Sequence, residues 1–498
     1  MRVSSGRTVL ITSLLIFGML FCSMPVQAQT TRNYVYNEYA EAVNAPNAYI
    51  CDRILRGREL GIGDFSKISD IYVNNNIYIA DPGNNRIVVL TPDYRLVRVI
   101  DAVEAEGQRC PLNNPQGVFL RDGILYVCDT GNGRVIGINE NDVIVRSYTK
   151  PDSDLLTEDF EYKPSKVVVN SAGSVFVAAS GVYQGLLHYE NDGTFLEFFG
   201  ANKVEVTLQV IMKSLWMNIF SQEQRESLVR SVPTEYAGIF IDSESMIYTT
   251  TITAQESQVK RLNASGENIL IYPGSSGSLL QKGYNRNNFG DQQTDTVKGG
   301  IKRSEIMDVE VDEDGMIAVL DSQRGRVFLF DSEQNPLCIF GGSGTQDGYF
   351  VKASALGKSG EDYLVADYDT NGITVFEPTE YMKNIQSALR EYSQGNYEKS
   401  REYWKCVLEK NAGLAVAFKG VGRTLLLEGN YEEAMDYLKK GDDRYYYSLA
   451  LTSYRRDFLR ENSIWLVPCA VAAVIVFVAA VQRIHRAILR SGERRAKR

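Results

Sequence analysis

The sequence contains only two histidines, His188 and His485, among its 498 residues. His485 lies in a basic segment at the C-terminal end, so the body of the chain has a single histidine. A metal site built from several histidines is therefore excluded. A Ser-His-Asp arrangement would have to use His188.

Cysteine is scarce as well, with seven in the chain. Cys22 and Cys469 fall in apolar terminal segments, which leaves an odd number at irregular spacings: Cys51, Cys110, Cys128, Cys338 and Cys406. This pattern indicates neither a disulfide scaffold nor a zinc site of paired cysteines. One bridge, for example between Cys51 and Cys110, stays open as an alternative.

Positive charge is scarce in the body of the protein. The net charge is −9, yet residues 1–28 carry +2 and residues 483–498 carry +6, so the remainder carries −17. An acidic body repels phosphate backbones, which makes nucleic acid a poor partner. Because 44% of residues are hydrophobic and 23% charged, neither global disorder nor a multi-pass membrane protein is expected.

Two terminal segments predict the location of the protein. Residues 1–28 resemble a secretory signal peptide, with Arg2 and Arg7, an apolar core and a small-residue cleavage site ending at Ala28. Residues 464–481 form an uncharged apolar run long enough for one transmembrane helix. Pro468 near its start opposes an unbroken helix and predicts a kink there.

The residues after this run are strongly basic, which places a short cytoplasmic tail at 482–498. Both features predict a single-pass cell-membrane protein whose N-terminal domains are extracytoplasmic and whose C-terminus is cytoplasmic. The tail is too short for a folded output domain. Its charges are explained by topology and by attraction to anionic lipid.

The middle of the chain repeats. In the first two units a β-rich run ends in Asp and is followed by a Gly-Asn turn, an Arg and further β-rich runs, and weaker copies follow. The position aligned with the Asp is Asp81, Asp129, Ala179, Thr251, Asp321 and Asp367. With a further strand before most units, each has the four short strands of a β-propeller blade. The sixth unit lacks one strand. The unpaired segment Tyr49–Leu55 would supply it and close a six-bladed ring.

The first two units carry an Asp-x-Gly-Asn-x-Arg pattern, at Asp81-Gly83-Asn84-Arg86 and at Asp129-Gly131-Asn132-Arg134. This pattern resembles that of NHL-repeat propellers, and the resemblance covers residues 33–378. Blades three and four have lost it. Gly and Asn accept left-handed turns and Asp accepts turn N–H bonds, so we expect a structural role for these residues.

Two insertions lengthen the repeat. Residues 203–232 have apolar positions at helical spacing and predict a helical insertion. Residues 274–300 are rich in Gly, Ser, Asn and Gln and predict a flexible loop.

Residues 380–461 change to a helical period. Gly395, Tyr397, Ser400 and Tyr403 recur 34 residues later as Gly429, Tyr431, Ala434 and Tyr437. This period resembles tetratricopeptide (TPR) repeats. Two repeats are present, and residues 442–461 predict a third helix that leads to the membrane.

The residues identify no catalytic and no cofactor-binding side chain, and phosphate-loop, HExxH and GxSxG patterns are absent. We therefore expect a membrane-anchored binding or scaffolding protein without a cofactor. Its partners would be extracytoplasmic proteins, and proteins of similar layout suggest sugar-transport components. The alternative is a lactonase-like hydrolase, because related six-bladed propellers hold Ca²⁺ in the central channel. Only in that case would Asp70, Asp242, Glu305 and Asp308 be candidate metal ligands.

Overall fold

The structure is a computed structural model that describes most of the chain. The described residues are 33–37, 40–156, 159–200, 235–252, 258–270, 288–291, 295–297, 300–302 and 304–496. The predicted signal peptide and the predicted helical insertion at 203–232 lie outside them, as does most of the predicted loop at 274–300. The chain divides into two compact units, residues 1–383 and 384–498.

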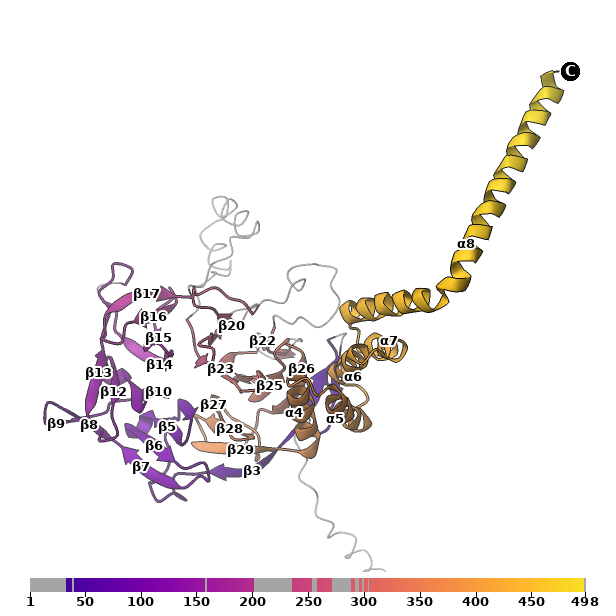
Figure 1. Ribbon diagram of the computed structural model, residues 1–498. Coiled ribbons are helices and arrows are strands. Elements are labelled where there is room, and N and C mark those ends of the chain that lie inside the picture. Colours follow the sequence, from indigo (N-terminus) through magenta and orange to yellow (C-terminus); the bar gives the residue numbers. More distant parts are fainter. Residues whose placement is uncertain are drawn as a thin grey trace, which may run out of the picture. The chain divides into compact units, whose positions relative to one another are not determined.

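The first unit is a six-bladed β-propeller, which confirms the predicted fold (Figure 1). Blade 1 consists of β4 (Asp70–Val73), β5 (Ile77–Asp81), β6 (Arg86–Leu90) and β7 (Leu96–Ile100). Blade 2 consists of β10 (Pro115–Arg121), β11 (Ile124–Asp129), β12 (Arg134–Ile138) and β13 (Ile144–Tyr148). Blade 3 consists of β14 (Lys163–Val169), β15 (Val175–Ser180), β16 (Leu186–Tyr189) and β17 (Phe195–Phe199).

The second half of the ring repeats this pattern. The described part of blade 4 consists of β18 (Ile239–Ile241), β19 (Ile247–Thr250) and β20 (Val259–Leu262). Blade 5 consists of β23 (Ile306–Val311), β24 (Ile317–Asp321), β25 (Arg326–Phe330) and β26 (Pro336–Gly341). Blade 6 consists of β27 (Ala353–Ser359), β28 (Asp362–Asp367), β29 (Gly372–Pro378) and β3 (Tyr49–Leu55). Every blade is antiparallel.

The strand β3 closes the ring, as predicted from the unpaired segment Tyr49–Leu55. It pairs with β29 from Pro378↔Tyr49 to Ile373↔Leu55. Blade 6 in turn contacts blade 1, where the Ser354 hydroxyl donates to the Ile68 carbonyl oxygen at 2.7 Å. The N-terminal strand β3 and the C-terminal strands of the propeller therefore form one blade, and this blade closes the ring against blade 1.

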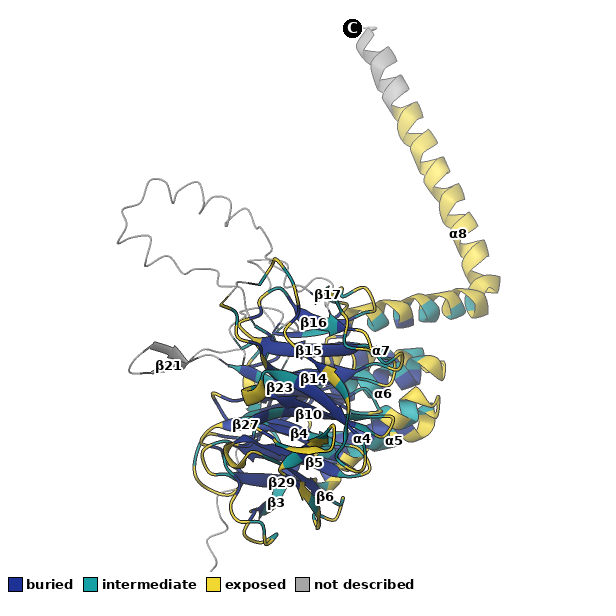
Figure 2. Ribbon diagram, turned by 90° about the vertical axis from the view of Figure 1, so that its left-hand side faces the viewer, coloured by how far each residue is buried: buried dark blue, intermediate teal, exposed yellow. Residues whose placement is uncertain are grey.

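The core lies between neighbouring blades. Apolar side chains of blade 6, such as Ala366, pack in one cluster with Ile79 of blade 1, and comparable clusters join the other blades. The second strands β5 and β24 are buried at every residue. Figure 2 shows this burial as dark blue across the blades. Sheet-on-sheet burial of this kind supplies most of the stability of the ring.

Several short elements were not foreseen. The strands β1 (Tyr34–Tyr36) and β2 (Ala42–Asn44) extend the outer edge of blade 5 through β26. Two hairpins consist of β8 (Ala102–Ala105) with β9 (Gln108–Pro111) and of β21 (Asp295–Val297) with β22 (Gly300–Lys302). Short 3₁₀ turns, η1 (Pro82–Asn84) and η2 (Thr130–Asn132), follow β5 and β11.

Part of the predicted flexible loop is fixed to blade 5. Phe289 is 1% exposed and packs against Phe330 with ring centroids 5.0 Å apart. The Asp291 carboxylate accepts hydrogen bonds from the Tyr36 hydroxyl at 2.7 Å and from the Arg324 guanidinium at 2.5 Å. An aromatic ring and a buried carboxylate therefore anchor residues 288–291, whereas the flexible loop predicted for 274–300 as a whole stays a prediction.

The second unit is helical. Its elements are α4 (Glu380–Ser393), α5 (Tyr397–Lys410), α6 (Ala415–Leu427), α7 (Tyr431–Lys440) and α8 (Arg444–Ala496). Gly395 and Gly429 have φ values of 81° and 86°, a conformation that glycine adopts without strain, directly before α5 and α7. The Ser400 hydroxyl donates to the Ala388 carbonyl oxygen at 2.8 Å, which holds α5 close to α4.

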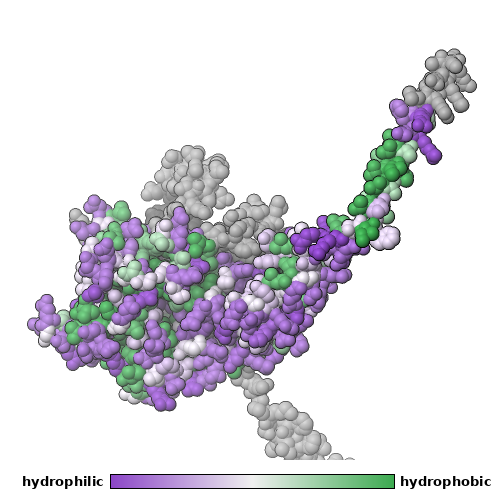
Figure 3. Space-filling view, in the orientation of Figure 1, coloured by the Kyte–Doolittle hydropathy of each residue, from purple (hydrophilic) through white to green (hydrophobic). Residues whose placement is uncertain are grey.

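The last helix, α8, covers nearly all of the predicted third helix at 442–461 and continues beyond it. It runs from Arg444 to Ala496 with Pro468 inside it. Figure 1 shows that α8 bends once along its length, as the loss of a backbone N–H at a proline allows. Its apolar stretch is long enough to cross a membrane, and none of that stretch is buried within the chain. Figure 3 shows it as a green band along α8.

Candidate functional site

The central channel of the propeller is lined by the innermost strand of each blade. These strands, β4, β10, β14, β18, β23 and β27, contact one another in a closed cycle. One position of the innermost strand is equivalent in every blade. Its residue pairs with the residue of the second strand that comes just before the aligned Asp position. Asp70 pairs there with Ala80, Lys166 with Ala178 and Asp308 with Leu320. The same position in the other blades is held by Gly117, Gly238 and Ala355.

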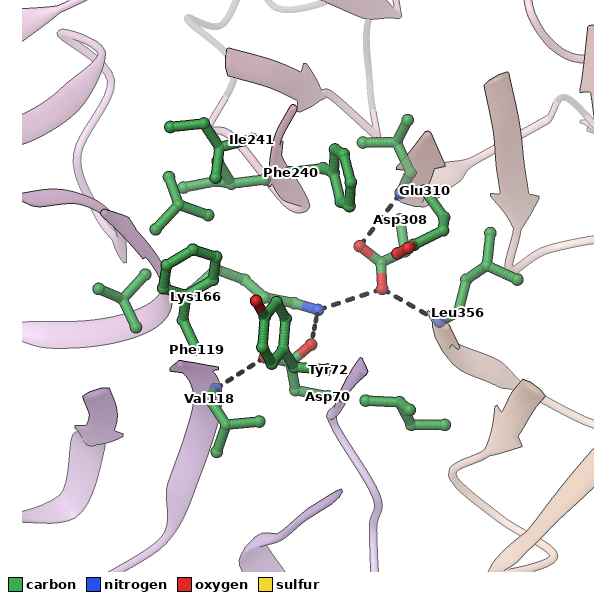
Figure 4. A pocket seen from close by; sticks show the side chains of 15 residues that line it. Asp70, Tyr72, Val118, Phe119, Lys166, Phe240, Ile241, Asp308, Glu310 and Leu356 are labelled. Atoms are coloured by element: carbon green, nitrogen blue, oxygen red, sulfur yellow. Dashed lines mark hydrogen bonds and ion pairs between the residues drawn. The ribbon is translucent and has the colours of Figure 1, made fainter. Parts of the chain in front are cut away.

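Three of these six equivalent residues carry charges, and the charges meet in the channel (Figure 4). The Lys166 ammonium group donates to Oδ1 of Asp70 at 2.5 Å and to Oδ2 of Asp308 at 3.1 Å. All three residues are buried, with 8%, 6% and 3% of their surfaces exposed. The lysine therefore bridges two carboxylates that come from the first and fifth blades.

Backbone groups of neighbouring blades complete the network. Asp70 accepts a hydrogen bond from Val118 N of blade 2 at 2.8 Å. Asp308 accepts one from Leu356 N of blade 6 at 3.1 Å and one from Val309 N at 3.1 Å. Buried carboxylates need such donors, because an unsatisfied charge away from water is costly.

Glycine makes room for these side chains. A Cβ at Gly238 would lie 2.7 Å from Oδ1 of Asp308, and a Cβ at Gly117 would lie 2.4 Å from the Ser165 carbonyl oxygen. Any larger residue would displace the ion pairs or the neighbouring strand. The glycines of blades 2 and 4 are therefore part of the same arrangement as the charges of blades 1, 3 and 5.

The charge state of the network follows from its contacts. Burial alone lowers the pKa of Lys166, but the carboxylates of Asp308 and Asp70 outweigh burial and hold that pKa above its ordinary value. Burial raises the pKa of Asp70, and the neighbouring ammonium group opposes this rise. The lysine is therefore charged at neutral pH.

A second layer of side chains lines a cavity next to the ion pairs. Its residues stand two positions further along each inner strand and include Tyr72, Phe119, Val168, Phe240 and Glu310. The free volume is about 30 Å³, enough for about two water molecules. The Tyr72 hydroxyl donates to the Leu120 carbonyl oxygen at 3.2 Å. Burial, followed by the charge of Asp308, raises the pKa of Glu310 well above its ordinary value.

Only two of the four predicted metal candidates come together. Asp70 and Asp308 meet in the channel. Asp242 instead accepts a hydrogen bond from Arg261 at 3.2 Å and from backbone N–H groups of its own turn. Glu305 is contacted by the Gln323 amide at 3.5 Å. Within the described part of the chain, no group of three or more His, Cys, Asp or Glu residues could hold a metal ion.

The channel residues do not fit the calcium ion that the resemblance to propeller hydrolases suggested. A calcium site needs several oxygen ligands with free lone pairs. Here the Lys166 ammonium group lies between the two carboxylates, so a cation would meet both a positive charge and an occupied space.

The repeat-pattern residues form hydrogen bonds within and between loops. Oδ1 of Asp81 accepts from Ser66 N at 2.7 Å, and Oδ2 accepts from Asn84 Nδ2 at 2.9 Å and Arg86 Nε at 2.7 Å. A Cβ at Gly83 would lie 2.2 Å from the Ser66 hydroxyl oxygen. The contacts with Ser66 tie the turn after β5 to the segment that enters the blade, and those of Asn84 and Arg86 hold the turn itself.

Blade 2 repeats the arrangement. Asp129 accepts from Asn113 N at 2.8 Å, from Asn132 Nδ2 at 2.8 Å and from Arg134 Nε at 2.9 Å. A Cβ at Gly131 would lie 2.4 Å from the Asn113 side chain. Asp81 and Asp129 are both fully buried and face away from solvent.

Comparison with known proteins gives no family assignment. No family model and no curated protein matches the chain. Among solved structures, virginiamycin B lyase from Staphylococcus aureus has 10% identity and a TM-score of 0.38, over 63% of this chain and 81% of that one. A Bacteroides caccae protein of unknown function has 10% identity and a TM-score of 0.35, over 66% and 98%. The extracellular domain of a B. thetaiotaomicron one component system, BT4673, has 11% identity and a TM-score of 0.32, over 62% and 33%.

Proposed function

We propose that this chain is a membrane-anchored extracytoplasmic binding or scaffolding protein. The observation that carries the proposal is the channel: its two converging carboxylates are already paired with Lys166. In the hydrolase alternative these carboxylates are the candidate ligands of a calcium ion. The surfaces of the propeller and of the helical unit are then left for function.

The location rests on the ends of the chain. The apolar stretch of α8 is a candidate membrane span, and arginines and lysines dominate the residues that follow it. Positive charges favour the cytoplasmic side, so the propeller and the helices α4–α7 would lie outside the cytoplasm. The signal-like sequence at residues 1–28 gives the same orientation.

Two kinds of surface support a protein partner. The outer strand of blade 1 exposes Leu96, Val97 and Val99 by 39%, 48% and 37%. Apolar side chains gathered on an edge strand are typical of contact surfaces. The helical unit, whose turns resemble tetratricopeptide repeats, offers helix faces of the sort that bind peptides. We expect extracytoplasmic partners, including transporter components, and NHL-type blades as the scaffold.

The proposal is tested by crosslinking in intact cells. A membrane-impermeant, lysine-reactive crosslinker is applied to cells that produce the full chain with an affinity tag. The chain is then purified under denaturing conditions, and the attached proteins are identified. We expect one or a few envelope proteins, absent from cells without crosslinker and from cells without the tagged chain.

Two substitutions at exposed positions test whether the outer strand of blade 1 contacts the partner. Val97→Lys should reduce recovery of a partner that contacts blade 1, whereas Leu155→Lys, at a 64% exposed loop position, should not. Recovery of no specific partner, together with calcium-dependent lactone hydrolysis by the purified chain, would contradict the proposal and restore the hydrolase alternative.

A further inference from the structure

One network of ion pairs and hydrogen bonds joins five of the six blades of the propeller, and the remaining blade packs closely against it. Lys166 of blade 3 binds Asp70 of blade 1 and Asp308 of blade 5. The same carboxylates accept from Val118 of blade 2 and from Leu356 of blade 6. Gly238 of blade 4 stands against Asp308, so close that a Cβ would lie 2.7 Å from its Oδ1.

We propose that Lys166 is an internal cation that takes the place of a bound metal ion in this channel. Its ammonium group neutralises the two carboxylates that converge from blades 1 and 5, and so holds the blades in register without any ion from solution. This inference concerns the channel alone and does not depend on the proposed binding function.

Charge balance explains why the lysine is needed. Without Lys166, two buried carboxylates would face each other across the channel, and like charges in a low-dielectric space repel strongly. Removing one partner of a buried ion pair leaves an uncompensated charge, which destabilises far more than replacing the whole set by neutral groups.

The space around the ammonium group also points to this role. Gly117, Gly238 and Ala355 hold the other three equivalent positions, so no long side chain competes with Lys166 at this level. The adjacent cavity holds about two water molecules, which is too small for a hydrated divalent cation beside the lysine. The network is therefore complete as it stands.

The first measurement uses the unaltered full chain, purified in detergent. Thermal unfolding is followed in EDTA and in millimolar calcium chloride. We expect the same unfolding temperature in both, because the carboxylates have no vacancy for the ion. An increase with calcium that is lost in Asp308→Asn would overturn the proposal, since calcium would then be displacing the lysine from this site.

The second measurement uses variants of the lysine. Lys166→Met should lower the unfolding temperature by on the order of 5 °C or more. The triple variant Lys166→Met with Asp70→Asn and Asp308→Asn should recover most of that loss, because no uncompensated charge is left. The control Lys163→Ala removes an exposed lysine, 55% accessible in its side chain, from the same strand and should have little effect.

Lys166→Ala provides the third measurement, because it leaves both carboxylates and opens space between them. Calcium should raise the unfolding temperature of this variant but not that of the unaltered chain or of Lys166→Met. If Lys166→Met does not fold while the triple variant does, the proposal is supported. A Lys166→Met chain as stable as the original, or a triple variant no more stable than Lys166→Met, would overturn it.

Discussion

The Nζ atom of Lys166 lies 2.5 Å from Oδ1 of Asp70, although 96 residues separate the two along the chain. The contact crosses the propeller channel and joins its third blade to its first. The second partner of Lys166 is the carboxylate of Asp308, which comes from the fifth blade. A single side chain therefore joins three of the six blades. These paired side chains thus occupy the channel at this level.

Closure of the ring can be tested at two adjacent residues of β3. Tyr49 is fully buried, with its ring centroid 4.6 Å from that of Phe340 and 5.2 Å from that of Tyr363. Tyr49→Ala should reduce the free energy of unfolding by about 3–5 kcal/mol. Ile50 is 45% exposed, so Ile50→Ala should cost less than about 1 kcal/mol. Urea unfolding of both variants measures this, and equal effects would contradict the pairing of β3 with β29.

The repeat-pattern aspartates should act on stability alone. Asp81→Ala removes the acceptor for Ser66 N, Asn84 and Arg86. We expect a loss of about 3–5 kcal/mol in urea unfolding, because buried donors lose their partner. Asp93→Ala, in an exposed turn of the same blade, should change stability by less than about 0.5 kcal/mol. Loss of partner recovery with unchanged stability would instead indicate a ligand site at Asp81.

Because Glu310 is a buried carboxyl group, the stability of the folded chain should depend on pH. Burial and the charge of Asp308 raise its pKa in the folded state above the ordinary glutamate value of 4.5. The folded chain then binds a proton that the unfolded chain releases, so stability falls as the pH rises above about 4.5. Glu310→Gln stays neutral, so it should be more stable than the original chain at neutral pH.

The advantage of Glu310→Gln should disappear below the ordinary glutamate pKa, where both side chains are neutral. Urea unfolding over a range of pH measures the difference, with Glu313→Gln in the exposed turn of the same blade as the control. Parallel stability curves for the Glu310 variant and the original chain would show that this carboxyl group has the same pKa folded and unfolded.

The helical unit has its own test at Gly420. A Cβ at this residue would lie 2.2 Å from Nε1 of Trp404, which is 2% exposed. Gly420→Ala should therefore destabilise the helices by about 1–3 kcal/mol, because the buried indole cannot move freely. At Gly413 the nearest atom, Asn411 Oδ1, would be 3.4 Å from the Cβ, so Gly413→Ala should be tolerated. Circular dichroism during heating compares the two.

The orientation in the membrane predicts which residues a protease can reach. In intact spheroplasts, the propeller should be cleaved, and a tag placed after Arg498 should be protected until the membrane is permeabilised. Deletion of Ile464–Val481 should release the chain from the membrane fraction, because the apolar stretch of α8 is removed. A C-terminal tag that is digested in intact spheroplasts would reverse the predicted topology.

The repeat made the ring predictable. Asp81 and Asp129 mark the same strand end in two units, and the unpaired segment Tyr49–Leu55 had to complete the last unit. Blades 3 and 4 lack the pattern, but the spacing of the repeat still predicted where their second strands end. Ala179 lies in β15 and Thr251 directly follows β19. Such signals survive because each blade buries the same faces against its neighbours.

The channel network was missed, although its signal is present in the repeat. Aligned by blade, the inner-strand position has acids at Asp70 and Asp308 and a lysine at Lys166. Considered one by one, the two aspartates suggested metal ligands. Only the geometry of the ring shows that Lys166 reaches both carboxylates. The strands β1 and β2 were missed for a different reason, because three-residue strands have too little periodicity to detect.

The most direct test of the account is an experimental high-resolution density map of the full chain prepared in calcium. We expect the Lys166 ammonium group within hydrogen-bond distance of both Asp70 and Asp308, with no metal ion in the channel. A calcium ion bound by these carboxylates, with the Lys166 side chain turned away, would contradict both the internal cation and the argument for a binding protein that rests on it.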